Sequence, residues 1–319
     1  MFDLHQRCLQ VISNDIFPVC SSYKEIVVIW LQRQFSEDTN CDGLNDYREL
    51  KYVFKTYEIN SSESVTCLEE TNKMGNKDGT TGLVTWQGSL GLLNFVTQGQ
   101  NVLPPKAKIL ELGSGAGLFG LGLLKTFEDV SSYTFTDENM KVLESIVTNF
   151  KINFNKSQCS FRHMAEWLEN GPPDNVLETN EVLHNDKGES LVQVKRLDWL
   201  NASDDLIASL DYNIIFGSDL TYTSALLKPL ALLLKRLLTA KSGHVLAYIA
   251  CTHRQTDTIK EFLGHMVDLD LQPTVALRTT FGPQYICVVG HEPLHSYSVF
   301  KISVVDKANI DPKNSPCVD

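Results

Sequence analysis

The chain of 319 residues lacks a hydrophobic run long enough to cross a bilayer. Its longest apolar runs, such as 27–31 and 245–250, are only a few residues long, whereas a membrane-spanning helix needs about 20. The first residues, MFDLHQRCLQ, also lack the charged-then-apolar pattern of a secretory signal. We therefore expect a cytoplasmic protein without a membrane partner.

Basic residues are in short supply, because 28 Lys and Arg stand against 39 Asp and Glu and leave a net charge of −11. Non-specific nucleic-acid binding uses a basic face, so this balance argues against a direct nucleic-acid partner. It is compatible with a local basic pocket, and acidic proteins often bind basic partners. With 43% hydrophobic residues, the chain can bury a large core in one large domain or two small ones.

Internal repeats are absent, and the eight cysteines include no C-x-x-C pair. No cysteine is spaced with a histidine in the manner of a zinc ligand. Reduced cysteines of a cytosolic protein are the simpler interpretation. Scattered histidines such as His253 and His265 are typical of surface or satisfied core groups, so we predict no metal.

Three zones follow one another along the chain. Residues 1–75 carry apolar residues at loose helical spacing and predict a helical N-terminal region. Residues 76–305 have the pattern of an α/β domain, in which the polar stretch 155–190 indicates a long inserted loop. We expect residues 306–319 to form a flexible tail.

Short apolar strands alternate with helical segments within the second zone. The predicted strands are 108–112, 133–136, 191–197, 212–217 and 243–251, and the predicted helices are 117–126, 140–153, 226–238 and 256–266. Two late strands, 284–290 and 297–304, are joined by a short segment and indicate a hairpin. This order predicts a Rossmann-like α/β sheet, mostly parallel with an antiparallel C-terminal edge strand, that binds a ligand where its strands end.

A glycine-rich loop, ELGSGAGLFG, follows the first of these strands. Glycines allow a sharp turn and a close approach of ligand to backbone N–H groups. Residues 115–120 match the G-x-G-x-x-G dinucleotide pattern, which is weak by itself, and a turn without a ligand is the plain alternative. Glu111 favours an adenosyl ligand, because a carboxylate beside Gly113 would repel a pyrophosphate. Asp137, at the end of the next strand, can accept ribose hydroxyls with either ligand.

Two further strand ends carry polar and aromatic groups. Asp198 and Trp199 follow the third strand, where the indole can stack on adenine and the carboxylate can accept from an amino group. Asp219 and Tyr222 follow the fourth strand at i, i+3 spacing and suit an amine, through charge attraction and cation–π contact. A Trp covering the core edge, an Asp capping a helix and a Tyr at the rim are the structural alternatives.

These residues together resemble the seven-stranded S-adenosylmethionine-dependent methyltransferases that modify lysines on non-histone proteins. The motifs ELGSGAG at 111–117, LDW at 197–199 and DLTY at 219–222 match that family in order. The motif TTGLVTW at 80–86 resembles the elongation factor 2 lysine methyltransferase branch. The resemblance implies a protein-lysine N-methyltransferase that uses S-adenosyl-L-methionine without a metal and acts on elongation factor 2. We expect a monomer by default.

The resemblance also implies roles for individual positions. The residues expected at the methyl donor are Trp86, Glu111, Gly113, Ser114, Gly115, Asp137, Asp198, Trp199 and Ser218. Asp219 and Tyr222 would be the catalytic pair that receives the target lysine. Lysine attacks as a neutral amine, so its proton must pass to Tyr222, Asp219 or water, and the nearby sulfonium would itself lower the lysine pKa. Whether either residue is a base or only orients lysine stays open.

Other functions are compatible with parts of this pattern. The same pocket could methylate another protein or a small molecule. The G-x-G-x-x-G match suggests a nicotinamide-linked oxidoreductase, for which the sequence offers no obvious hydride-transfer acid. A non-catalytic binding module is a further class, against which the intact acidic and Tyr positions argue. Because residues 76–305 look complete, we expect residues 1–75 to grip the protein substrate and their deletion to spare donor binding.

Overall fold

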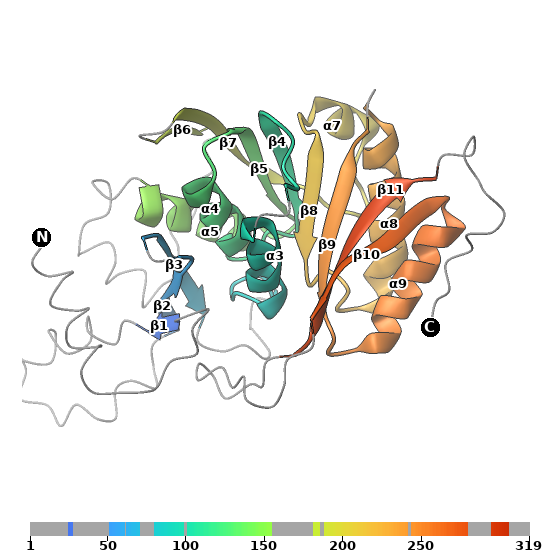
Figure 1. Ribbon diagram of the computed structural model, residues 1–319, viewed down its shortest axis with the longest axis horizontal. Coiled ribbons are helices and arrows are strands. Elements are labelled where there is room, and N and C mark those ends of the chain that lie inside the picture. The colour runs from blue at the N-terminus through green and yellow to red at the C-terminus, as the bar shows by residue number, and fades with distance from the viewer. Residues whose placement is uncertain are drawn as a thin grey trace, which may run out of the picture.

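The computed structural model describes residues 25–27, 51–60, 62–70, 80–98, 101–154, 181–185, 188–241, 244–279 and 295–305. The strands there form one three-stranded and one eight-stranded sheet (Figure 1). The larger sheet contains β4 (Ala107–Leu112), β5 (Val130–Asp137), β6 (Glu181–Asn185), β7 (Gly188–Arg196), β8 (Ile214–Ser218), β9 (Leu246–Thr252), β10 (Leu271–Thr279) and β11 (Tyr297–Val304). Their order across the sheet is β10-β11-β9-β8-β4-β5-β7-β6.

The first strand of this sheet lies near its centre. Strand β4 pairs in parallel with β5 on one side and with β8 on the other, and β7 and β9 extend the parallel part outward. The chain therefore reverses its direction of winding at β4, which is where open α/β sheets bind ligands. The glycine-rich loop leaves the sheet at this point.

Helices cover both faces of the sheet (Figure 1). The helices are α3 (Gln87–Thr97), α4 (Leu118–Thr126), α5 (Met140–Phe154), α7 (Asp204–Ser209), α8 (Ser224–Thr239) and α9 (Thr256–Asp268). One buried cluster contains residues of α3, α4 and α5, and a second contains residues of α7, α8 and α9. Strand β4 is buried on both faces, because Ile109 enters the first cluster and Leu110 the second.

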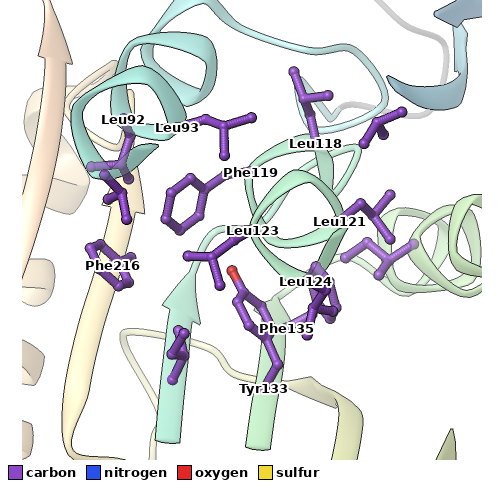
Figure 2. Close-up of a cluster of buried hydrophobic side chains, with 14 of the residues drawn as sticks. Leu92, Leu93, Leu118, Phe119, Leu121, Leu123, Leu124, Tyr133, Phe135 and Phe216 are labelled. Carbon is purple, nitrogen blue, oxygen red and sulfur yellow. The ribbon is translucent and has the colours of Figure 1, made fainter. Parts of the chain in front are cut away.

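Close packing of α4 on the sheet explains one glycine of the dinucleotide-like pattern. A Cβ on Gly120 would lie 2.3 Å from Phe135 Cε1 and 2.6 Å from Tyr133 Cζ, which is closer than atoms can approach. Figure 2 shows Phe119 and Leu121 of this helix among the buried side chains of the first cluster. Gly120 therefore serves helix packing.

The predicted mostly parallel α/β sheet is confirmed, with corrections at both of its edges. Strand β11 is antiparallel as expected but lies between β9 and β10, one position inside the edge. The strand that pairs with β11 on its outer side is β10, whereas the predicted hairpin strand 284–290 lies outside the described residues. The sequence did not indicate β10, because this edge strand is mostly exposed and lacks an apolar alternation. Strand β6 also falls within the stretch predicted as a loop, and pairs with β7.

The N-terminal region differs from the expected helical structure in its described part. Here β1 (Glu25–Val27), β2 (Tyr52–Glu58) and β3 (Ser64–Glu70) form an antiparallel sheet in the order β1-β2-β3. Strands β2 and β3 are rich in β-branched and aromatic residues, which favours a pleated hairpin over a helix. The apolar residues near the chain start lie outside the described residues.

The β2–β3 hairpin packs on the larger sheet's helical layer. Asn149 of α5 accepts from the Leu68 backbone N–H at 2.7 Å, and Asn153, one turn later, accepts from the Thr66 N–H at 3.0 Å. These side chains thus pair with the backbone of β3 as a neighbouring strand would. Val65 and Cys67 also belong to the first buried cluster. The hairpin therefore shares the core of the α/β domain.

Among the described residues, the structure contains no helix with the length and apolar character needed to span a membrane.

Candidate functional site

The glycine-rich loop adopts a backbone that side chains disfavour. Gly113, Gly115 and Gly117 have φ values of 57°, 54° and 82°, in the left-handed region that glycine enters at little cost. Gly117 is the N-cap of α4, so the loop ends at a helix N-terminus whose first N–H groups lack helical partners. A ligand can therefore approach this backbone closely.

The loop is tied to the end of the neighbouring strand β5. Ser114 donates its N–H to the Thr136 carbonyl at 2.8 Å, and its Oγ accepts from the Thr136 N–H at 3.0 Å. The Gly115 N–H lies 3.4 Å from Asp137 Oδ2. Burial raises the Asp137 pKa, while hydrogen bonds from backbone N–H groups oppose that rise. The structure thus brings Ser114, Gly115 and Asp137 together at the ends of β4 and β5.

Glu111 lies beneath the loop and faces the core. Its side chain is 2% exposed, and its Oε2 accepts from the Tyr133 hydroxyl at 2.8 Å. Burial raises the pKa of Glu111 to about 8, although hydrogen bonds from Tyr133 and Ser114 lower it. The carboxyl therefore keeps its proton to a higher pH than an exposed glutamate does. Glu111 consequently repels an anion less than the sequence suggested, and a cation nearby would favour its charged form.

Trp199 lies beside Gly113 of the loop. A Cβ on Gly113 would be 3.3 Å from Trp199 Cζ2 and 2.6 Å from Leu220 Cδ2. Asp198 is engaged in its own turn, because it accepts from the Leu200 N–H at 2.8 Å and from Asn201 Nδ2 at 2.6 Å. The Asn201 hydrogen bond lowers the Asp198 pKa. Trp199 is therefore placed to flank a ligand, whereas Asp198 shapes the turn that carries it.

Asp219 joins three elements, β8, α3 and β9, at the carboxyl end of the parallel strands. It follows Ser218, the last residue of β8, and has a φ of 51°. Its carboxylate accepts from the Gly88 N–H at 2.7 Å, the Thr252 N–H at 2.8 Å and the Thr252 hydroxyl at 2.9 Å. Gly88 is the second residue of α3, so the carboxylate also satisfies an N–H at a helix N-terminus. This arrangement positions α3 against β8 and β9.

Tyr222 has surroundings that differ from those of Asp219. Its side chain is 53% exposed. Burial of part of the ring raises the Tyr222 pKa, and so do the negative charges of Asp137 and Glu138. The phenol is therefore protonated at neutral pH, and it lies close enough to Asp137 to feel the charge of that carboxylate. The predicted catalytic pair is thus divided between a residue bound within the protein and one open to solvent.

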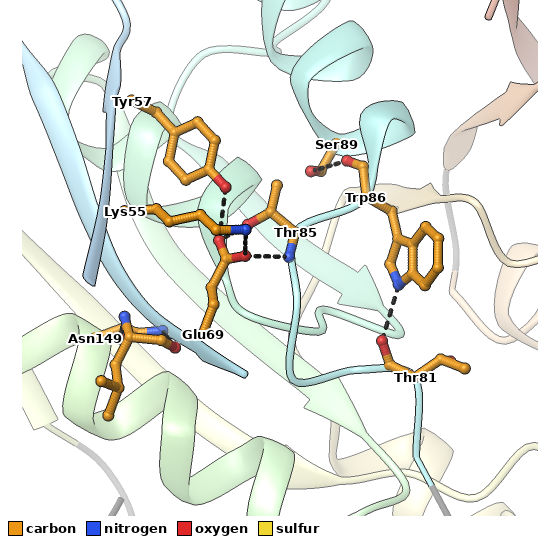
Figure 3. Close-up of polar contacts among 9 residues, drawn as sticks. Lys55, Tyr57, Glu69, Thr81, Thr85, Trp86, Ser89 and Asn149 are labelled. Atoms are coloured by element: carbon orange, nitrogen blue, oxygen red, sulfur yellow. Dashed lines mark hydrogen bonds and ion pairs between the residues drawn. The ribbon is translucent and has the colours of Figure 1, made fainter. Parts of the chain in front are cut away.

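Trp86 is the N-cap residue of α3. Its indole Nε1 donates to the Thr81 carbonyl at 2.8 Å (Figure 3), and the Arg254 guanidinium carbon lies 4.6 Å from the ring centroid. The preceding residues touch the glycine loop, because a Cβ on Gly115 would be 3.4 Å from the Gly82 carbonyl oxygen. The TTGLVTW segment therefore packs against the loop.

The sequence analysis did not identify three residues near these strand ends: Gly88, Thr252 and Arg254. Thr252 and Arg254 come at the end of β9, so the rule that ligands bind where parallel strands end could have indicated them. Gly88 carries no chemical signal of its own. Among the residues that the structure describes, no three His, Cys, Asp or Glu side chains gather into a metal-binding group.

Known proteins share this sequence pattern. The chain is 31% identical over 214 residues to the protein-lysine N-methyltransferase EEF2KMT of Bos taurus, a match that covers 66% of this chain and 58% of that protein. It is 30% identical over 220 residues to the Mus musculus protein of that name, covering 69% and 58%. For protein-lysine N-methyltransferase EFM3 of Saccharomyces cerevisiae the identity is 25% over 226 residues, covering 67% and 57%.

The chain thus spans less than two thirds of the length of these relatives. A profile of the lysine methyltransferase family matches residues 65–186 and 173–268, which include the glycine-rich loop, Asp137, Trp199 and the Asp219–Tyr222 motif. On this match, the chain belongs to the lysine methyltransferase family.

Proposed function

We propose that this protein is a protein-lysine N-methyltransferase that transfers a methyl group from S-adenosyl-L-methionine to a lysine of elongation factor 2. The family match over residues 65–268 carries the proposal. It is supported by a left-handed glycine loop at the point where the sheet reverses its winding, with Asp137 beside it. The resemblance of TTGLVTW to the elongation factor 2 branch supports the choice of substrate.

The residues around the loop fit an adenosyl ligand with an amino-acid portion. A Cβ would collide with a neighbouring side chain at Gly113 and press on a backbone carbonyl at Gly115, so glycine at both positions leaves the loop backbone accessible. Asp137 would accept from the ribose hydroxyls, and Trp199 would flank the adenine ring. Trp86 and Ser218 would border the same pocket. When bound, S-adenosylmethionine supplies a methyl group that its cationic sulfonium already activates, so the proposal includes no metal.

The chain's task is then to align a neutral lysine amine with that methyl group. The half-exposed ring of Tyr222 suits the approach of a lysine side chain through cation–π contact. Its hydroxyl can accept a hydrogen bond from the amine, and the released proton can pass through it to water. Asp219, with three protein donors on its carboxylate, would support the site by holding α3 and β9 in place.

A donor-binding and methyl-transfer experiment tests this proposal. Purified chain, labelled S-adenosylmethionine and purified elongation factor 2 are incubated, and mass spectrometry identifies any methylated lysine. Gly113→Ala should abolish donor binding and labelling, because its Cβ would meet Leu220 at 2.6 Å and a left-handed Ala costs roughly 1–2 kcal/mol. Gly264→Ala is the matched control, since a Cβ there meets nothing within 4 Å.

The outcomes separate the competing functions. The full proposal is supported if the parent chain and Gly264→Ala both label a lysine of elongation factor 2 while Gly113→Ala does not. Donor binding without this label, together with label on another protein or small molecule from a lysate, would retain the methyltransferase and replace the substrate. Binding of a nicotinamide dinucleotide in place of S-adenosylmethionine would overturn the proposal.

A further inference from the structure

Glu69 of β3 forms a buried link between the N-terminal hairpin and the segment before Trp86. The side chain is fully buried. Its Oε1 accepts from the Tyr57 hydroxyl at 2.7 Å and from the Thr85 hydroxyl at 2.6 Å. Its Oε2 accepts from Lys55 Nζ at 3.0 Å and from the Thr85 N–H at 3.0 Å (Figure 3). Each oxygen therefore joins one donor of the hairpin to one donor of the segment.

Stability alone gives a weak reason for this arrangement. Lys55 is 8% exposed, so its ammonium and the Glu69 carboxylate are both largely removed from water. The cost of removing two charges from water often cancels their attraction, and apolar residues of similar size can stabilise such a site equally well. A charged pair does, however, impose directional contacts on its neighbours. Here the neighbour is the backbone of Thr85.

The segment that contains Trp86 is held at both ends by carboxylates. Glu69 binds the Thr85 N–H and hydroxyl, and Asp219 binds the Gly88 N–H. An additional backbone bond of 2.9 Å joins the Glu70 N–H to the Leu83 carbonyl. Trp86 lies between the two carboxylate contacts, at the start of α3. The backbone position of Trp86 consequently depends on Glu69 of the hairpin as well as on Asp219.

We propose that Glu69 is a positioning residue of the methyl-donor site, which acts through Thr85 to hold the Trp86 segment against the glycine loop. The proposal rests on the proposed function, since it assumes that S-adenosylmethionine binds at that loop. It makes the β2–β3 hairpin a part of the donor site. Deletion of residues 1–75 should then weaken donor binding, which is the opposite of the outcome that the sequence predicted.

Donor affinity in a double-mutant cycle tests the role of Glu69. Glu69→Gln replaces one accepting oxygen by an amide that faces a donor, and Thr85→Val removes the hydroxyl donor while keeping the backbone N–H. We expect the dissociation constant of S-adenosylmethionine, measured by calorimetry, to rise about tenfold for Glu69→Gln and about three- to fivefold for Thr85→Val. The double variant should bind about as weakly as Glu69→Gln alone, because the second change acts through the first.

A matched threonine variant separates positioning from general destabilisation. Thr56→Val also removes a hydroxyl contact, since Thr56 Oγ1 lies 2.9 Å from Thr66 Oγ1 within the hairpin and away from Glu69. It should leave donor affinity within about twofold of the parent chain. Hydrogen exchange in the donor-free protein gives a second readout, and the amides of 81–88 should exchange faster in Thr85→Val than in Thr56→Val. This comparison decides the question even where Glu69→Gln does not fold.

The results distinguish this inference from the proposed function. If the parent chain binds S-adenosylmethionine and all variants bind it equally, the positioning role of Glu69 is refuted while the methyltransferase proposal stands. The same holds if Thr56→Val loses as much affinity as Thr85→Val. A parent chain that does not bind S-adenosylmethionine would refute both.

Discussion

Replacement of Asp219 distinguishes a residue that positions the site from one that contacts the lysine. The carboxylate accepts from Gly88 and Thr252 at distances between 2.7 and 2.9 Å. Loss of a hydrogen bond to a charged group costs about 1.5–3 kcal/mol, and loss of a helix cap about 1 kcal/mol. We expect Asp219→Ala to lower the free energy of unfolding by about 3 kcal/mol, less than the sum because water can reach the site. Asp219→Asn retains one accepting oxygen and should cost about 1–2 kcal/mol.

Three measurements on the same variants provide the assay: urea unfolding, calorimetry with S-adenosylmethionine, and steady-state methyl transfer. Because Asp219 holds the start of α3 and thereby Trp86, Asp219→Asn should weaken donor binding about three- to tenfold. Asp211→Asn is the matched control. Its carboxylate is 67% exposed and bonds Lys108 at the surface, so unfolding should change by less than about 0.5 kcal/mol.

An alternative result would refute this role of Asp219. If Asp219→Asn unfolds with the free energy of the parent chain and binds S-adenosylmethionine equally well, the carboxylate does not position α3. A loss confined to turnover or to the Michaelis constant for the protein substrate would then indicate direct contact with lysine.

Further predictions concern Tyr222 and Glu111. Tyr222→Phe should lower kcat at least tenfold, because general acid–base groups contribute about 10²–10⁴-fold, while the free energy of unfolding changes by less than about 0.5 kcal/mol at this half-exposed position; an unchanged kcat would assign the proton to water. Burial raises the pKa of Glu111 from 4.5 to about 8. The stability that the protonated carboxyl contributes is therefore complete below pH 4.5 and is lost as the pH rises through about 8. Urea unfolding should therefore show Glu111→Gln gaining stability relative to the parent chain between about pH 5 and pH 9; parallel curves would contradict the raised pKa.

Several features of the site follow from local sequence. Buried parallel strands are short apolar runs, so β4 and β8 are visible without a structure. Gly113 and Gly115 directly follow such a strand, and only glycine takes their backbone conformation at little cost. Because the carboxyl ends of parallel strands lie together, Asp137 and Trp199 could be placed near each other from their positions in the chain. Tyr222 could be placed there too, because it closely follows the parallel strand β8.

Other features depend on contacts between distant residues. The β2–β3 hairpin was missed because the helical prediction for residues 1–75 rested on apolar spacing outside β2 and β3, whereas these strands are rich in β-branched and aromatic residues. Asn149 and Asn153 of α5 supply hydrogen-bond partners for the backbone of β3, which no local pattern indicates. The edge strand β10 has few buried residues and therefore a weak pattern.

Roles were the least predictable property. Asp219 has the same chemistry whether it receives a lysine or binds the Gly88 N–H, and these two residues are 131 positions apart. Glu69 likewise resembles any strand carboxylate until the fold places Lys55 and Thr85 against it. The sequence by itself determined the parallel strands of the sheet and the glycine loop, because strand burial and glycine conformation are local. Only the tertiary structure decided which carboxylates hold the scaffold, since a carboxylate's role depends on the donors that folding brings to it.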